Sequence, residues 1–322
     1  MNNSKHKMID NYLLSKKVCA KPFLKWVGGK GQLLSSIEKS LPREVFTLSD
    51  LTYIEPFVGG GAMLFWVLTN IKSIKKAVIN DINPDLTNAY LTVRDNVDEL
   101  IAELKHTQDE YYSLKAEEKR KEFFLAKRER FNIELLGKVE NTALFIFLNR
   151  TCFNGLFRVN SKGSFNVPFG KYTNPTICDE NTLLADSELL QKVEILTGDF
   201  EQTFSYGTEN TLFYFDPPYK PLSQTSSFNS YSKEEFGDSE QIRLKRFCDK
   251  LNDKGYWWIL SNSDVKSKDT ENDFFDSLYS SYQIERVWAS RSVNANPEKR
   301  GKLTELLITN KPLKELEYVR AI

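Results

Sequence analysis

The sequence predicts an α/β fold, in which a mainly parallel β-sheet is covered by helices on both faces and interrupted by a helical insertion. Seven short runs rich in β-branched and aromatic residues recur along the chain, at 53–55, 77–80, 193–197, 211–215, 256–261, 283–289 and 305–309. Helical patterns follow several of these runs, as at 62–70 and 239–253, and such alternation favours a parallel sheet. The last two runs have no helix between them, so the far edge of the sheet is expected to be antiparallel.

The alternation breaks in the middle of the chain. Helical patterns occur there at 96–106, 110–136 and 141–149. They are followed by a loop, 150–175, that is rich in Gly, Asn, Ser and Phe. We interpret 91–189 as an inserted domain and 1–90 together with 190–322 as the domain that contains the sheet. The basic and aromatic loop is expected to face a ligand held by the sheet domain.

The composition is that of an ordinary globular protein. The 322 residues are 40% apolar and 27% charged, which is enough for a substantial core and excludes a disordered or collagen-like chain. Four scattered cysteines and two histidines argue against a disulfide scaffold and against a metal site such as zinc. The amino-terminal region has no apolar core of signal-peptide type, and no apolar run approaches the length of a membrane span. We therefore expect a cytoplasmic protein without a membrane partner.

The formal net charge is zero, but the charges are segregated along the chain. Residues 1–30 hold seven lysines against one aspartate, 149–178 hold four basic residues and no acid, and 286–302 hold five basic residues against one glutamate. Three basic stretches far apart in sequence are suited to converge on one anionic ligand, such as a phosphate backbone. On charge alone, solvated lysine faces explain the pattern equally well.

Two neighbouring features indicate a nucleotide-like ligand. A strand runs into Gly59, Gly60 and Gly61 and then into an apolar helix, which lets a ligand approach the backbone closely. Leu64 stands where the dinucleotide fingerprint requires a small residue, so a nicotinamide dehydrogenase is disfavoured. Asp81 ends the next strand, where a ribose diol is commonly bound. A plain tight turn and a helix-capping aspartate remain alternatives when each feature is taken alone.

The segment Asp216-Pro217-Pro218-Tyr219 is the most informative. It follows an apolar strand, so its acid and its aromatic ring are expected at the carboxyl edge of the sheet, where α/β proteins bind ligands. The prolines fix the turn and donate no hydrogen bonds, which leaves local carbonyl groups free as acceptors. A carboxylate, a free carbonyl and an aromatic ring form a receptor for a flat heterocycle with an amino group. A rigid turn alone explains the prolines but not the flanking Asp216 and Tyr219.

Five segments together point to one family. They are FLKWVGGK at 23–30, EPFVGGG at 55–61, NRTCFNGLFRVN at 149–160, FNVPFG at 165–170 and DPPY at 216–219, and further matches follow at 260–263 and 300–307. In this order they resemble the Dam-type adenine-specific DNA methyltransferases, close to the GATC-methylating members of restriction–modification systems. The resemblance implies a Rossmann-like methyltransferase sheet with an inserted target-recognition domain.

The resemblance also implies the chemistry. S-adenosylmethionine would donate the methyl group and leave as S-adenosylhomocysteine, and the acceptor would be the amino group of an adenine flipped out of duplex DNA. Asp216 and the Pro217 carbonyl would accept the two amine protons and aim the nitrogen lone pair at the methyl group, while Tyr219 would stack on the base. No metal is required for this chemistry.

Further roles carry over from the family motifs. The residues implied for cofactor binding are Trp26, Lys30, Phe57, Gly59, Gly61, Asp81, Asp199, Phe200 and Asp216. For DNA, Arg158 would bind a guanine edge, Leu156 a thymine methyl group and Lys25 a second guanine. Phe153 would wedge where the base leaves, and Asn154 and Arg150 would hold phosphates. The family often has Tyr at this position, so Phe153 keeps the ring for stacking but lacks the hydroxyl group. A loop that packs its aromatic residues inward is the alternative.

The implied partner is double-stranded DNA, with GATC as the expected target. A longer palindrome that contains GAT is the main alternative. An RNA or protein methyltransferase would more often carry Asn before Pro-Pro-Tyr, and a silent DNA-binding relative would not need the complete motif. A restriction endonuclease is expected as a genetic partner only, and the enzyme as a monomer or weak dimer in the cytoplasm.

Overall fold

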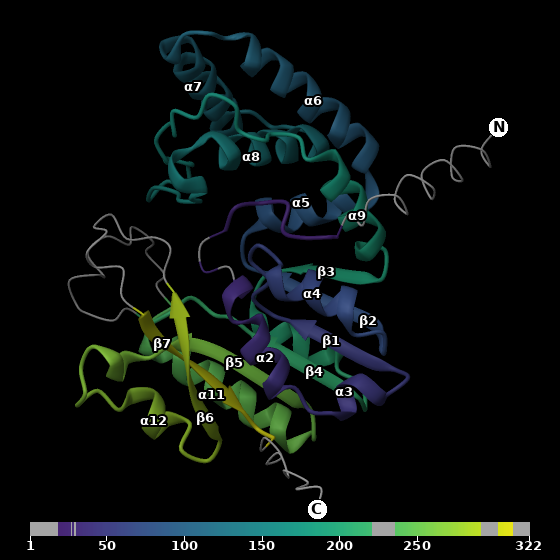
Figure 1. The fold of residues 1–322 in the computed structure, drawn as a ribbon, viewed down its shortest axis with the longest axis vertical. Helices are drawn as coiled ribbons and strands as arrows, with labels where there is room; N and C mark the ends of the chain where they lie inside the picture. The colour runs from purple at the N-terminus through teal and green to yellow at the C-terminus, as the bar shows by residue number, and fades with distance from the viewer. Residues whose placement is uncertain (1–18, 27, 29, 221–235, 291–301, 312–322) are drawn as a thin grey trace, which may run out of the picture.

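A single seven-stranded sheet forms the centre of the protein (Figure 1). The computed structural model describes residues 19–26, 28, 30–220, 236–290 and 302–311. The strands are β1 (Leu51–Glu55), β2 (Ile74–Asp81), β3 (Val193–Thr197), β4 (Thr211–Phe215), β5 (Trp257–Ser263), β6 (Gln283–Ser290) and β7 (Lys302–Thr309). Their order is β3-β2-β1-β4-β5-β7-β6. The first five strands are parallel and β7 is antiparallel to both neighbours, which confirms the predicted fold class and the antiparallel edge.

Helices cover both faces of this sheet because its central strands are buried on both sides. Every residue of β1 and β4 is buried. Alternate side chains point to opposite faces. Tyr53 and Tyr214 pack in the core beneath α4 (Ala62–Asn70), whereas Ile54 and Phe213 pack on the other face with Phe247 of α11 (Asp238–Asp253). Both helices were predicted within one residue of their observed ends.

Helices also make up the lobe above the sheet in Figure 1. It contains α6 (Val97–Ser113), α7 (Glu117–Ile133), α8 (Lys138–Thr151) and the 3-10 turn η2 (Phe153–Gly155). The predicted helical span 110–136 was wrong at its start, because α6 ends at Ser113 and α7 begins only at Glu117. The side chain of Arg120 donates to the carbonyls of Leu114 and Lys115 and so satisfies the chain at this break.

The connection between lobe and sheet is made by α5 (Pro84–Asp95) and α9 (Glu180–Leu190). α5 packs against α6, α8 and α9 as well as against β2 and β3. The boundaries of the inserted domain at 91–189 stay a prediction. The remaining helices of the described residues are η1 (Lys30–Gln32), α2 (Leu34–Ser40), α3 (Glu44–Thr47), η3 (Phe200–Tyr206), η4 (Val265–Ser267) and α12 (Phe274–Leu278). In the described part of the chain, no helix combines the length and the apolar character that crossing a bilayer would require.

An extended amino-terminal segment, residues 19–26, runs between the lobe and the sheet (Figure 1). Its Lys21 N–H donates to Oδ1 of Asp186 at 3.1 Å, and Phe23 meets Tyr90 edge to face. Asp186 lies on α9 and is fully buried, yet its Oδ2 has no hydrogen-bond partner among the residues that the structure describes. Burial raises the pKa of Asp186 to about 8, against the opposing effect of the Lys21 N–H.

We expect Asp186→Asn to change how stability depends on pH. The folded-state pKa of Asp186 lies above that of an unfolded aspartate, which is about 4. The stability that depends on a protonated Asp186 is therefore fully present below about pH 4 and is lost as the pH rises through about 8. The variant should be more stable than the unaltered protein above pH 8, with a flatter profile over this window. Chemical denaturation at several pH values measures this. An unchanged profile would contradict the inferred protonation of Asp186.

A candidate active site at the carboxyl edge of the sheet

The carboxyl ends of the parallel strands form one edge of the sheet, and the predicted motifs meet there. β1 lies between β2 and β4. The glycine turn after β1 is therefore flanked by Asp81, which ends β2, and by Asp216, which follows β4. The chain continues from β1 to β2 on one side and returns as β4 on the other. Such a switch point is where open α/β sheets bind their ligands.

A buried cluster of charged groups surrounds Asp216. The Lys30 Nζ lies 3.0 Å from Oδ1 of Asp216, 2.5 Å from the Tyr219 hydroxyl oxygen and 3.6 Å from Oε2 of Glu305. The Tyr219 hydroxyl donates to the same Glu305 oxygen at 2.7 Å. The Lys30 side chain is only 6% exposed, so its charge depends on these oxygens in place of water. The cluster joins three parts of the chain that are distant in sequence.

Asp216 is poised between burial and this positive charge. Its side chain is 22% exposed, and Ser261 Oγ donates to its Oδ1 at 3.2 Å. Burial raises the pKa of Asp216 to about 6, although Lys30 acts in the opposite direction. Nearby Glu55 is buried and accepts a hydrogen bond from Tyr53, and burial raises its pKa well above the usual range. Burial thus opposes ionisation of both carboxyl groups, and of the two it is Asp216 that has a cationic partner to counter this effect.

The glycine turn is shaped by the aromatic residues packed against it. Gly59 and Gly61 have positive φ angles of 49° and 76°, which favour glycine. A Cβ atom on Gly60 would lie 2.7 Å from Cβ of Trp26, and one on Gly61 would lie 2.4 Å from the Tyr90 hydroxyl oxygen. The protein's own packing therefore requires these glycines, in addition to any ligand that approaches the turn.

Asp81 fixes the turn from the neighbouring strand. Its Oδ2 accepts from the Gly59 N–H at 3.1 Å and its Oδ1 from the Asn83 N–H at 3.0 Å. Asn83 caps α5, so the alternative that Asp81 is the capping residue was wrong. Burial has the larger effect on the pKa of Asp81 and raises it, although these backbone hydrogen bonds lower it. Beside Asp81, Ile82 is 73% exposed and offers an apolar surface at the same edge.

Asp199 and Phe200 lie after β3 and already have partners within the protein. Arg243 donates to both carboxylate oxygens of Asp199, at 3.0 and 2.7 Å, and this pairing lowers the pKa of Asp199. Phe200 is buried, and its ring centroid lies 5.3 Å from that of Phe57 and 5.5 Å from that of Phe247. The Arg243 guanidinium lies 4.2 Å from the Phe200 ring centroid. A role of these two residues in cofactor binding stays a prediction.

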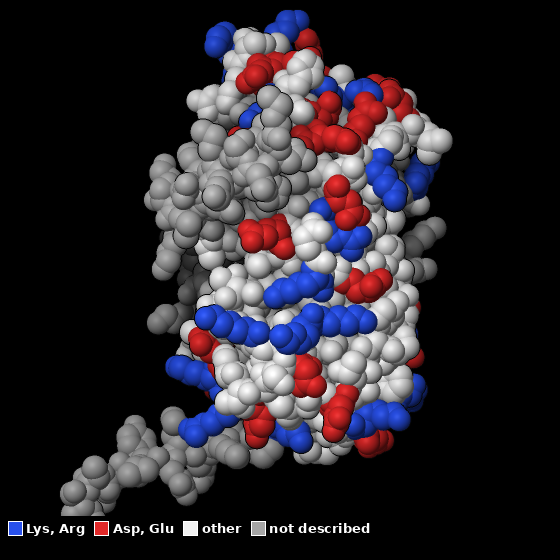
Figure 2. Space-filling view, turned by 90° about the vertical axis from the view of Figure 1, so that its right-hand side faces the viewer, with Lys and Arg blue, Asp and Glu red and all other residues white. Residues whose placement is uncertain are grey.

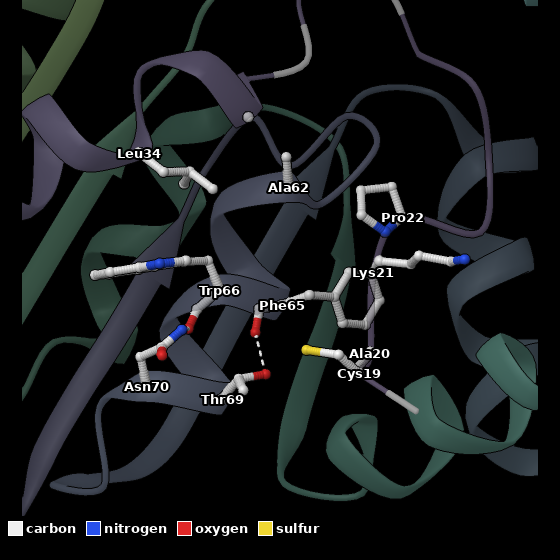
Figure 3. A pocket seen from close by; sticks show the side chains of 11 residues that line it. Cys19, Ala20, Lys21, Pro22, Leu34, Ala62, Phe65, Trp66, Thr69 and Asn70 are labelled. Carbon is white, nitrogen blue, oxygen red and sulfur yellow. Dashed lines mark hydrogen bonds between the residues drawn. The ribbon is translucent and has the colours of Figure 1, made fainter. Parts of the chain in front are cut away.

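A separate hollow of about 340 Å³ lies on the other side of the glycine turn, between residues 19–22, α2 and α4 (Figure 3). Leu34, Ala62, Phe65 and Trp66 line it, and the Thr69 hydroxyl is turned to a carbonyl of its own helix. The lining is apolar and offers few groups that could bind the charged parts of a cofactor. Within the described residues, no three His, Cys, Asp or Glu side chains are grouped to hold a metal ion.

Comparison with known proteins identifies the family. The model of the family described as D12 class N6 adenine-specific DNA methyltransferase matches residues 26–293, which include the glycine turn, Asp81 and the segment 216–219. The chain belongs to this family. It is an adenine-specific DNA methyltransferase, as the resemblance to the Dam-type enzymes predicted.

The methyltransferase is similar to curated relatives over most of its length. Type II methyltransferase M.MjaIII of Methanocaldococcus jannaschii is 50% identical over 293 residues, which cover 90% of this chain and 99% of the relative. Type II methyltransferase M1.LlaDCHI of Lactococcus lactis subsp. cremoris is 38% identical, covering 93% and 99%. The DNA adenine methylase of Haemophilus influenzae is 36% identical, covering 91% and 95%.

In this methyltransferase, the loop expected to contact DNA is tied to the amino-terminal segment by Asn149. The Asn149 amide is buried. Its Oδ1 accepts from the Lys25 N–H at 2.8 Å, and its Nδ2 donates to the carbonyls of Lys25 and Gly155 at 2.8 and 3.0 Å. Trp26, which follows Lys25 in the chain, stacks on Phe157 with ring centroids 5.8 Å apart. Trp26 also packs on Gly60. The glycine turn and the loop thus share one contact residue.

The predicted DNA-contacting residues differ in how far they reach solvent. Phe153 is 52% exposed, and Asn154 and Arg158 are exposed as well, whereas Leu156 is half-buried. Lys25 is exposed, and its ammonium group lies 4.8 Å from the centroid of the Tyr172 ring. The Asn149 contacts hold Lys25 next to the loop that carries the other residues. Their roles in binding DNA stay predictions.

Arg150 has a different environment. Its Nη2 donates to the Phe23 carbonyl at 2.6 Å, and its Nε is buried without a partner among the described residues. The side chain therefore joins α8 to the amino-terminal segment. A phosphate contact by Arg150 stays a prediction, and this internal bond would have to persist or be exchanged when DNA binds.

Acidic partners neutralise several side chains of the basic stretches. Arg286 pairs with Asp276 at 2.8 Å and Lys171 with Glu117 at 2.9 Å. On the flank that carries β3, Lys and Arg lie among Asp and Glu (Figure 2). Among the described residues of the stretches, three exposed cations have no carboxylate partner: Lys25, Arg158 and Lys162. Most of 1–30 and of 286–302 lies outside the described residues.

Sequence reasoning did not single out several residues that build this site. Glu305 and Ser261 complete the cluster around Asp216, and Asn149 joins the loop to the amino-terminal segment. Glu305 did carry a signal, because it is an acid at the start of an otherwise apolar predicted strand. Ile82 carried one too, as an apolar residue directly after a strand-ending acid. Ser261 lies in the family match at 260–263, but its contact with Asp216 could not be predicted, because it depends on the pairing of β5 with β4.

We call the three hydrogen bonds of Asn149 to the backbone of Lys25 and Gly155 the Asn149 clamp. We expect Asn149→Ala to destabilise the protein by about 2–4 kcal/mol, because these three backbone groups lose a buried partner. Asn141→Ala on the same helix is the matched control, since Asn141 is only partly buried and makes longer bonds. It should cost less than about 1 kcal/mol. Equilibrium denaturation with urea measures both. Equal losses for the two variants would contradict the assigned role of Asn149.

Proposed function

We propose that this methyltransferase transfers the methyl group of S-adenosylmethionine to the N6 amino group of an adenine within GATC in duplex DNA. The observation that carries the proposal is the position of Asp216. It is a partly exposed carboxylate at the ligand-binding edge, held by Lys30 and Ser261 and followed directly by Pro217 and Tyr219. The chemistry needs such an acceptor group, fixed in direction, where the amine of a base can reach it.

The amino group of adenine is a poor nucleophile because its lone pair is delocalised into the ring. Asp216 accepts a hydrogen bond from one N–H of the amine and the Pro217 carbonyl accepts one from the other, which directs the lone pair out of the plane of the base. No described residue donates to the Pro217 carbonyl, whereas the Pro218 carbonyl is bonded to Gln241 at 3.2 Å. The free acceptor is therefore the one next to Asp216.

Tyr219 supports the base through its ring. Its hydroxyl is fixed by Lys30 and Glu305, so the ring orientation is set before a base arrives. Extruding a base from duplex DNA costs a few kcal/mol, and stacking on an aromatic ring contributes about 1–3 kcal/mol in return. The exposed Phe153 ring is available to fill the space that the base leaves.

S-adenosylmethionine supplies an electrophilic methyl group bound to a sulfonium. Two features of the edge fit this cofactor. The turn at Gly59 and Gly61 lies at the carboxyl edge between Asp81 and Asp216, and the Asp81 carboxylate is held there as an acceptor for a ribose diol. The exposed Ile82 offers an apolar contact for an adenine ring. Trp26, which packs on Gly59 and Gly60, and Phe57, whose ring centroid lies 5.3 Å from that of Phe200, are proposed to support the bound cofactor.

The target sequence is proposed from the loop at 149–170. Its motifs resemble those of GATC-specific Dam-type enzymes, and relatives include proteins named DNA adenine methylase. A longer palindrome containing GAT is the alternative. Relatives named type II methyltransferases support a restriction endonuclease as genetic partner. We place the enzyme in the cytoplasm, as a monomer or weak dimer.

Methyl transfer from labelled S-adenosylmethionine tests the proposal. The substrates are duplexes with GATC, a scrambled site, and GATC within longer palindromes. We expect transfer only to duplexes with GATC, and a loss of at least 10²-fold in Asp216→Ala, because the amine loses its acceptor. Transfer confined to the longer sites would keep the chemistry and overturn the target. Cofactor binding without transfer to any DNA would redirect the search to RNA or protein.

The pH dependence of kcat tests the state of Asp216. Only the ionised carboxylate accepts the amine proton, so the rate should fall as the pH drops through about 6. Glu305 raises the pKa of Asp216 through its negative charge, so Glu305→Gln should move this limb to lower pH. Glu285→Gln on the adjacent strand β6 is the matched control. A limb that stays in place in Glu305→Gln would contradict the electrostatic coupling.

A further inference from the structure

Residues 158–166 form a short β-hairpin on the helical lobe. The Asn160 N–H donates to the Ser164 carbonyl at 2.9 Å, and the Asn166 N–H donates to the Arg158 carbonyl at 3.1 Å. The Asn160 side chain accepts two further N–H groups inside the turn, one of them from Ser164 at 3.1 Å. Arg158 and Asn166 are therefore cross-strand neighbours at the base of the hairpin.

The base of this hairpin is fixed to the lobe. Oδ1 of Asn132 accepts from the Phe165 N–H at 2.8 Å, and Nδ2 of Asn132 donates to the Phe165 carbonyl at 3.1 Å. The Phe165 ring is buried between Phe157 and Phe131, with centroids at 5.8 and 6.3 Å. Phe157 and Phe165, which precede Arg158 and Asn166 in the chain, are anchored in the lobe. Arg158 and Asn166 are therefore held at the surface by a rigid support.

The guanidinium of Arg158 is held on one side only. Its Nε donates to Oδ1 of Asn166 at 2.8 Å, and its Nη2 lies 3.4 Å from the Asn166 carbonyl oxygen. These bonds occupy the inner edge of the group. The outer edge, formed by both protons of Nη1 and the second proton of Nη2, has no partner among the described residues. That edge has the geometry of a bidentate contact with O6 and N7 of guanine.

We propose that Asn166 is a positioning residue for sequence discrimination: it fixes the inner edge of Arg158 so that the outer edge meets a guanine. The inference rests on the proposed function, which assigns a guanine contact to Arg158. An arginine in solution must lose rotamer freedom to make a directed contact, and a support that has already removed this freedom strengthens the contact with the correct base. Asn166 does this without touching DNA.

The test compares four proteins: the unaltered enzyme, Asn166→Ala, Arg158→Ala and the double variant. For each, kcat/KM is measured on the preferred duplex and on duplexes in which each guanine–cytosine pair of the target is replaced in turn. Arg158→Ala should lower the ratio of preferred to altered site by about 10- to 100-fold at one position. Asn166→Ala should lower the same ratio at the same position, by on the order of tenfold, and the double variant should match Arg158→Ala.

Asn166→Asp separates positioning from simple structural support, because it keeps the acceptor for Nε. Its added negative charge should weaken transfer to all duplexes alike and leave the discrimination ratio within about twofold of the unaltered enzyme. Equilibrium binding of the same duplexes, followed by fluorescence anisotropy, gives the ratio independently of turnover. Melting temperatures of all variants show whether the hairpin support has been lost.

Three outcomes overturn the proposal. Asn166→Ala with an unchanged ratio would show that Arg158 needs no support, and additive losses in the double variant would show that the two residues act separately. A lowered ratio that Asn166→Asp does not restore, with a lowered melting temperature in both, would assign Asn166 a structural role only. If Arg158→Ala itself leaves every ratio unchanged, the failure lies in the proposed guanine contact.

Discussion

The ammonium group of Lys30 is the constraint on which the arrangement of the active site depends. A charge that is 6% exposed is tolerated only where oxygens replace its hydration, and unpaired it would cost several kcal/mol. Its partners are Asp216 after β4, Tyr219 in the same turn and Glu305 on β7. Satisfying one buried charge thus brings together η1, the turn after β4 and the non-adjacent strand β7. The same contacts hold the acceptor carboxylate at the edge of the sheet with a fixed direction.

A second constraint joins this edge to the helical lobe. The segment 19–26 has few hydrogen bonds of its own, and its backbone is satisfied by side chains of α8 and α9, Asn149 and Asp186 among them. Trp26 then contacts the glycine turn on one side and Phe157 on the other. Because the loop and the glycine turn both pack on the Trp26 ring, a displacement of the loop would also displace the turn. The parts proposed to bind cofactor and DNA are linked by packing rather than by a flexible hinge.

The sequence predicted the elements whose signal is local. The strands were predictable because buried strands such as β4 and β5 contain continuous apolar runs, and the edge followed from their order. The break between α6 and α7 was not predictable, because it is stabilised by the Arg120 side chain, which donates to the Leu114 and Lys115 carbonyls. At the site, Asp216 and the glycines carried motif signals. The contacts of Glu305 with Lys30 and of Arg243 with Asp199 could not be predicted, since both depend on which elements become neighbours in space.

The distribution of charge decides how such a chain can discriminate between DNA sequences. The formal net charge is zero, so any attraction to phosphates depends on the cations that lack acidic partners rather than on the charge of the chain as a whole. Among the described residues these include Lys25 and Arg158, which lie on either side of the Asn149 clamp, and Lys162 at the tip of the hairpin. Arg286 and Lys171 are already neutralised. In the proposed guanine contact, an arginine held by its inner edge loses less rotamer freedom on binding than a free one, so the contact costs less entropy.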